Sequence, residues 1–166
     1  MSELKAQMTA GPTGLVIVLE GSIDEDVKFP AVDASKHAAI RVDLQGVKTI
    51  NSVGIREWLN WIRPLAEARP VTLSKCPKAL VFQLNMVEGF LPKNGTVDSF
   101  FVPFFCEKCD KEQSVLFTVG KEVTAGPSGP NLTFDLKAAK LCAEAECEME
   151  MDASEAKYFQ FLKKFG

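Results

Sequence analysis

Residues 41–59 constrain the fold of this chain more than any other segment. They begin with an apolar run ending at Asp43-Leu44, which predicts a strand, and continue through a predicted Gln45-Gly46 turn into a second short strand. The polar pair Asn51-Ser52 then leads into an amphipathic helix predicted over residues 54–68. Its apolar residues recur at helical spacing on one face: Ile55, Trp58, Leu59, Ile62 and Leu65. A strand that leads directly into such a helix favours an α/β arrangement.

Other segments continue the alternation of strands and helices. Strands are predicted at residues 15–19, 39–44 and 71–74, a helix at 77–87 that stops at Gly89, and a Phe-rich extended segment at 97–105. Residues 24–39 hold at most a short helix. Pro64 should kink the long helix or end its regular part early, and Pro103 should lie at a sheet edge or exit. The pattern predicts a small mixed or parallel sheet with helices packed on it.

The start of the long helix is the first candidate site. Backbone N–H groups are unpaired at a helix start, and the helix dipole adds positive potential there. Asn51 and Ser52 are favoured N-cap residues, and Gly54 allows another backbone to approach closely. Such a tip suits a phosphate, a carboxylate or a docking partner. An ordinary capped turn between a strand and a helix is the alternative.

The same segment resembles the signature of STAS domains, the anti-sigma-factor-antagonist family, in which a strand ending in Asp-Leu precedes Asp-Ser-Ser-Gly at a helix start. Residues 15–24, which end in Gly21-Ser22-Ile23-Asp24, also resemble the first strand of that family and its Gly-x-Ile-Asp corner. Asn51 stands where the family has Asp, and Ser52 matches the first serine. Val53 occupies the place of the serine that carries the regulatory phosphate, so the phosphorylation switch should not be present.

The resemblance implies a non-catalytic regulatory module that binds a switch kinase, an anti-sigma factor or another signalling domain. The implied contact surface is the tip formed by Asn51, Ser52, Val53 and Gly54, together with Arg56 on the first turns of the helix. Trp61 lies beside the core stripe of the helix and either packs inside the protein or anchors a partner. A small-ligand or anion sensor at the same helix start is the alternative function.

Four cysteines predict a structural zinc site. Cys106 and Cys109 have the spacing of a zinc knuckle, and Cys142 and Cys147 supply a second, wider pair. Two reduced pairs or a Cys142–Cys147 disulfide are the alternatives, as is a metal or redox sensor. Four thiolates leave no open position for catalysis. Cys76 is predicted to be a buried small apolar residue.

The C-terminal part also resembles the zinc-ribbon tails that follow STAS-like domains in some bacterial proteins. The residues carrying this likeness are 99–109 and the Met149-Glu150-Met151-Asp152 run before 158–162. The sequence thus predicts a STAS-like domain over residues 4–104 and a zinc-ribbon-like domain over residues 105–166. Because so small a ribbon cannot bury its apolar residues alone, two groups should pack against the first domain. They are Phe100, Phe101, Phe104 and Phe105 at this boundary, and Phe159, Leu162 and Phe165 on a final helix.

Composition limits the remaining functions. A net charge of −3 argues against nucleic-acid binding. No apolar run is long enough to span a membrane and the N-terminus lacks a signal-peptide pattern, so cytoplasmic residence is expected. No set of nucleophile, base and stabilising groups indicates an enzyme. The acidic corner Asp24-Glu25-Asp26 is expected to be a solvated loop, with a partner contact as the alternative. The sequence does not decide between a monomer and a homo-oligomer.

Overall fold

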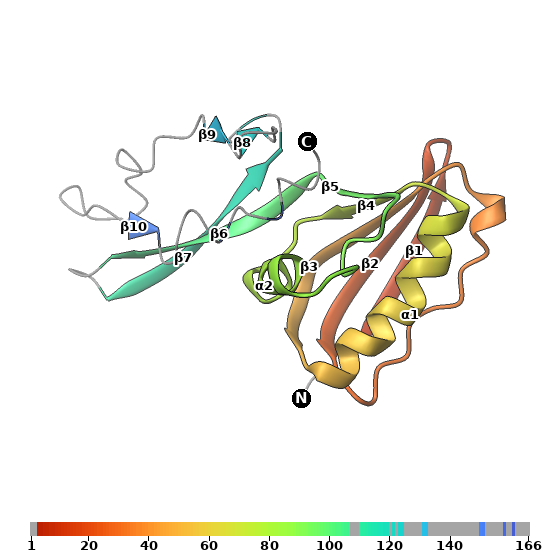
Figure 1. The fold of residues 1–166 in the computed structure, drawn as a ribbon, viewed down its shortest axis with the longest axis horizontal. Coiled ribbons are helices and arrows are strands. Elements are labelled where there is room, and N and C mark those ends of the chain that lie inside the picture. Colours follow the sequence, from red (N-terminus) through yellow and green to blue (C-terminus); the bar gives the residue numbers. More distant parts are fainter. Residues whose placement is uncertain are drawn as a thin grey trace.

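The computed structural model describes residues 3–106, 110–119, 121, 123–124, 131–132, 150–151, 158 and 161 (Figure 1). Its main element is a five-stranded sheet in the order β1-β2-β3-β4-β5. These strands are β1 Lys5–Gly11, β2 Gly14–Ile23, β3 Ile40–Ile50, β4 Val71–Ser74 and β5 Gly95–Val97. β1 is antiparallel to β2, and the other neighbours are parallel. The predicted mixed α/β class is therefore confirmed.

Two helices cover one face of this sheet (Figure 1). Helix α1 Ser52–Ala68 connects β3 to β4, and α2 Lys78–Met86 connects β4 to β5. Because the parallel strands follow one another in chain order, right-handed crossovers place every connection on the same side. The 3-10 turn η1 Ala34–Lys36 lies in the β2–β3 connection.

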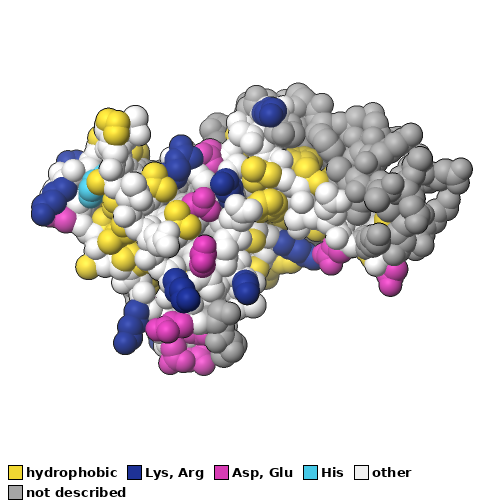
Figure 2. Space-filling model, turned by 180° about the vertical axis from the view of Figure 1, so that it is seen from behind, with side chains coloured by type: hydrophobic (Ala, Val, Ile, Leu, Met, Phe, Trp, Pro, Cys, Tyr) yellow, Lys and Arg dark blue, Asp and Glu magenta, His cyan; other side chains and the backbone are white. Residues whose placement is uncertain are grey.

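The core lies between the sheet and this helical layer. Ile17, Leu19 and Val42 of the sheet are fully buried, as are Trp58 and Ile62 of α1. The opposite face of the sheet carries exposed side chains such as Glu20, Arg41 and Gln45. Figure 2 shows this side of the molecule, where basic and acidic side chains are interspersed with hydrophobic ones.

A second sheet extends away from the first (Figure 1). Its order is β10-β6-β7, with β6 Ser99–Cys106, β7 Lys111–Thr118 and β10 Glu150–Met151. A small pair of strands consists of β8 Val123–Thr124 and β9 Asn131–Leu132. Only Asp98 separates β5 from β6. Phe100 of β6 also forms a parallel β-bridge with Cys76, which follows β4 in the chain. The boundary expected between residues 104 and 105 thus falls inside a continuous strand.

The aromatic residues after β5 do pack against the first domain. Phe100, Phe104 and Phe117 are fully buried, and the ring of Phe161 meets Phe100 edge-on at 5.0 Å. From the helical layer, Asn85 of α2 donates to the carbonyl of Tyr158 and accepts from the backbone N–H of Phe161, at 3.0 and 2.8 Å. Phe159, Leu162 and Phe165, which were expected in the same contact, lie outside the described residues.

Several local expectations were wrong. Gln45-Gly46 is not a turn, because β3 continues through these residues to Ile50. Its backbone stays paired with β2 over this length, with shifts in the register on either side of Glu20. Gly46 is needed there, since a Cβ atom would lie 2.6 Å from the Glu20 side chain. Residues 5–11, which had no predicted structure, form the edge strand β1.

Pro64 does not end its helix early, and Pro103 does not lie on an edge strand. Helix α1 continues through Pro64 to Ala68, so the loss of one N–H does not end it. Pro103 lies in the middle strand of its sheet and is buried. In the described part of the chain, β10 pairs only with Phe104 and Phe105, so Pro103 lies just beyond that ladder.

Candidate functional site

Asn51 fixes the start of α1. Its side-chain oxygen accepts a hydrogen bond from the backbone N–H of Gly54 at 2.8 Å, and its carbonyl accepts from Ile55 at 2.8 Å. Its own backbone N–H donates to the carbonyl of Ile23 at 3.1 Å, which ties the helix start to the end of β2. The expected capped turn is therefore present at this position.

Ser52 is not the cap, contrary to the role expected for its hydroxyl. It is the first helical residue and is exposed, while the extended backbone of Asn51 places the amide side chain over the N–H of Gly54. Only one of two adjacent cap-type residues can occupy the N-cap position, and pairing of Asn51 with Ile23 decides which one does.

Another backbone segment does lie close to Gly54, as its lack of a side chain allows. That segment belongs to the same chain and not to a partner. A Cβ atom at this position would lie 2.0 Å from the carbonyl oxygen of Ile23. Gly54 is buried, so a partner cannot reach it. Gly54→Arg would therefore force the helix away from the sheet and could not serve as a surface probe.

The exposed part of the tip is smaller than the predicted set. Asn51, the cap, is exposed. On the helix itself, Ser52, Val53 and Arg56 are exposed, and Val53 is one of the large hydrophobic residues that remain open to solvent, with an exposed fraction of 37%. These three residues lie on the first turns of a helix whose position is fixed by Asn51 and Gly54. They form what we call the tip surface.

Trp61 does not belong to the tip surface. It lies two turns further along α1, where its ring stacks on Phe29 with 4.7 Å between centroids. Its indole N–H donates to the carbonyl of Pro30 at 2.9 Å. Trp61 therefore packs against the β2–β3 connection, and this contact needs no external partner.

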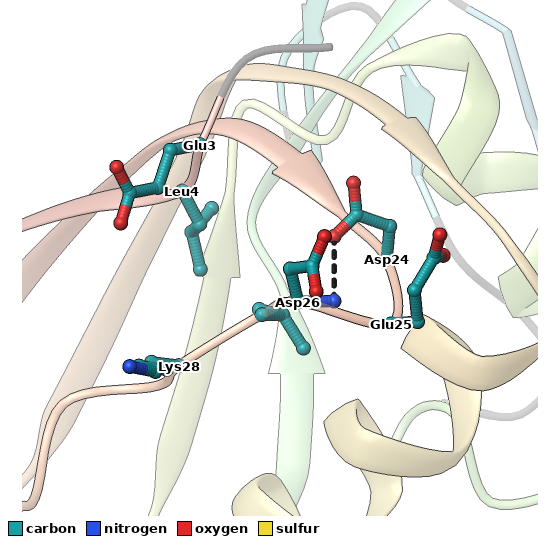
Figure 3. A pocket seen from close by; sticks show the side chains of 7 residues that line it. Glu3, Leu4, Asp24, Glu25, Asp26 and Lys28 are labelled. Carbon is teal, nitrogen blue, oxygen red and sulfur yellow. Dashed lines mark hydrogen bonds between the residues drawn. The ribbon is translucent and has the colours of Figure 1, made fainter.

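An acidic hollow, whose lining Figure 3 shows, lies next to the contact between Glu25 and the cap residue Asn51. It has a volume of about 620 Å³, and its lining includes four acidic residues, Glu3, Asp24, Glu25 and Asp26, and one basic residue, Lys28. Asp24 is buried and accepts from the backbone N–H of Asp26 at 3.0 Å. Among the described residues, no group of three or more His, Cys, Asp or Glu side chains is arranged to hold a metal ion.

Glu25 links this hollow to the cap. Its carboxylate accepts a hydrogen bond from the side-chain amide of Asn51 at 2.8 Å. Its own backbone N–H and that amide hold the pKa of Glu25 below its ordinary value. No sequence pattern indicates this pair, because the two residues are 26 positions apart. A carboxylate beside the helix start partly offsets the positive potential of the dipole, which argues against a bound anion.

The structure describes one of the four predicted zinc ligands. Cys106 ends β6 and is buried, with 1% of its surface exposed. Cys109, Cys142 and Cys147 lie outside the described residues. Cys76 is fully buried, as expected, and burial raises the pKa of its thiol.

Comparisons with known proteins add no assignment. No protein-family model matches the sequence, and no curated protein matches it significantly. Within the described part of the chain, no helix is both long and apolar enough to cross a membrane.

Proposed function

We propose that this chain is a non-catalytic regulatory module, similar to STAS domains, that binds another protein through its tip surface. The supporting observation is the exposed Val53 between Ser52 and Arg56, on a helix start that Asn51 and Gly54 fix rigidly against β2. An exposed apolar residue on a rigid element favours binding because little conformational entropy is lost on docking.

The partner class proposed is a switch kinase, an anti-sigma factor or another signalling domain in the cytoplasm. A phosphoserine would add roughly two negative charges. Val53 cannot be phosphorylated, so the module keeps the uncharged state, and its binding depends on abundance or on the C-terminal unit. Glu25, which contacts Asn51, and its neighbour Asp26 add exposed negative charge beside the helix start that carries Arg56, so the partner surface should carry charges of both signs around an apolar centre.

The acidic hollow disfavours anion binding at this helix start, so protein binding is the better supported of the two functions. Glu25 lies within hydrogen-bonding distance of the cap itself, and Asp24 and Asp26 flank it. A phosphate or carboxylate would therefore approach against several like charges.

The test is affinity purification of the full chain from its native host, followed by titration with the recovered protein. Val53→Asp and Arg56→Glu should each weaken binding at least tenfold, which corresponds to about 1.4 kcal/mol. Val16→Asp is the matched control. Val16 has the same 37% exposed fraction as Val53, but it lies near the start of β2, whereas helix α1 contacts the Ile23 end of that strand. Equal binding by all three variants would show that the tip surface is not the contact surface.

We also propose a structural zinc ion in the C-terminal unit, bound by Cys106, Cys109, Cys142 and Cys147. Cysteine spacing supports this site, and the position of Cys106 at the end of β6 suits a knuckle that begins where a strand stops. The ion would hold together two cysteine pairs that are far apart in the sequence, and it would stabilise only the folded form of this unit.

A further inference from the structure

The outer edge of β1 is not covered by any other residue that the structure describes. β1 pairs with β2 over all seven of its residues, from Lys5 opposite Glu20 to Gly11 opposite Gly14. Within the described part of the chain it has no strand on its other side, and every one of its residues is exposed. Such an edge presents unpaired N–H and C=O groups to any strand that can lie alongside it.

The register shows which backbone groups face outward. The two-residue loop makes Gly11 and Gly14 a hydrogen-bonded pair. Along an antiparallel ladder, hydrogen-bonded pairs then alternate with pairs whose backbone groups point away from each other. The N–H of Leu15 accordingly donates to Ala39 on the β3 side, at 2.9 Å. By the same alternation, Ala6, Met8 and Ala10 direct their N–H and C=O groups away from β2.

This edge lacks the features that usually prevent pairing. It contains no proline and has a single charged residue, Lys5, at its end. Ala6, Met8 and Ala10 also share one side of the strand, opposite the buried Leu19, Ile17 and Leu15. Met8 is an exposed large hydrophobic residue with a 48% exposed fraction.

We propose that β1 pairs with β1 of a second copy of this chain, antiparallel and centred on Met8. The outward-facing residues are symmetric about Met8, so Ala6 meets Ala10 of the second copy and the two Met8 residues meet each other. Each of these pairs can exchange both of its backbone hydrogen bonds. Lys5 falls opposite Gly11 of the second copy, so no like charges are opposed.

This pairing makes one continuous sheet from two five-stranded sheets, with both helical layers on the same face. It leaves the tip surface free, because that surface follows β3 and lies on α1 rather than on β1. Since the two copies run antiparallel, their tip surfaces point in opposite directions. The dimer is therefore a bivalent form of the module, and it does not depend on the proposed function of the tip.

Sedimentation velocity of the full chain over a wide concentration range tests this proposal. The joined edge is small, so we expect a weak monomer–dimer equilibrium that shifts toward the dimer as the concentration rises. Met8→Lys places two lysines directly opposite each other and should weaken the dimer at least about tenfold. An equimolar mixture of Met8→Lys and Met8→Glu should restore the dimer, which excludes misfolding as the cause.

Val16→Lys is the matched control. It introduces the same charge at an exposed valine one strand inward, opposite Thr9 and away from the free edge. A dimer in Val16→Lys, its loss in Met8→Lys and its recovery in the mixture support the proposal. A wild type that stays monomeric into the millimolar range, a Met8→Lys protein that still dimerises, or a mixture that fails to associate overturns it.

Discussion

Gly54 and Ile23 are in such close contact that a Cβ atom on Gly54 would lie 2.0 Å from the Ile23 carbonyl oxygen. This contact lets the first turn of α1 rest directly on the end of β2. It also lets the Asn51 N–H reach the same carbonyl. The position of the tip surface thus depends on a glycine that no partner touches.

Gly54→Ala should lower the free energy of unfolding by about 1–3 kcal/mol, because the added methyl group overpacks a backbone contact. Chemical denaturation measures this change. Arg56→Ala, at an exposed position on the same helix, is the control and should stay within about 0.5 kcal/mol of the wild type. A Gly54→Ala protein as stable as the control would show that the helix start can move without cost.

Asn51→Ala should cost about 1 kcal/mol of stability, since the N–H of Gly54 loses its cap. Ser52→Ala should leave stability nearly unchanged, because Ser52 is the exposed first helical residue. Thermal or denaturant unfolding of the two variants side by side distinguishes them. The reverse order of stabilities would assign the cap to Ser52.

The lowered pKa of Glu25 predicts a dependence of stability on pH. A carboxylate whose pKa is lower in the folded state stabilises the protein above its unfolded value, here about 4.5, and this contribution is lost as the pH falls through the folded value. Glu25→Gln should therefore be less stable than the wild type at neutral pH, and the difference should shrink below about pH 4.5. Denaturant unfolding from neutral to acidic pH measures it; a difference that stays constant contradicts the pairing with Asn51.

Asn85→Ala should loosen the C-terminal segment from α2. The variant loses the hydrogen bonds to the Tyr158 carbonyl and the Phe161 N–H, each worth about 1 kcal/mol. Limited proteolysis should cut the C-terminal segment faster than in the wild type. Met86→Ala is the control, because Met86 is the neighbouring residue and is 79% exposed; equal cleavage of the two variants would contradict the coupling.

Zinc should bind at about one equivalent per chain if four thiolates form the site. Elemental analysis of purified protein measures this, and Cys109→Ser should abolish it while Cys76→Ser retains the metal. Chelation should unfold the C-terminal unit selectively, because only its folded form is held by the ligands. Absence of metal with all four thiols reactive in the native protein would refute the site.

The sequence by itself determined the local features whose causes are local. Helical spacing identified Trp58, Ile62 and Leu65 as buried residues, and a polar pair before a glycine placed the start of α1 within two residues. Apolar runs bounded by glycine or proline identified β2 and β4, and Gly89 marked the region where α2 ends. These signals depend on propensity and periodicity within a few residues.

Only the tertiary structure decided the contacts between distant residues. β1 is a strand, and β3 continues through Gln45-Gly46 without a turn, because β2 supplies their hydrogen-bond partners; the short sequence around Gln45-Gly46 alone favours a turn between two separate strands. The bond from Trp61 to Pro30 and the bond from Asn51 to Glu25 join residues 31 and 26 positions apart. The sheet order brings these residues together, and it depends on backbone pairing across the whole domain, which no single segment encodes.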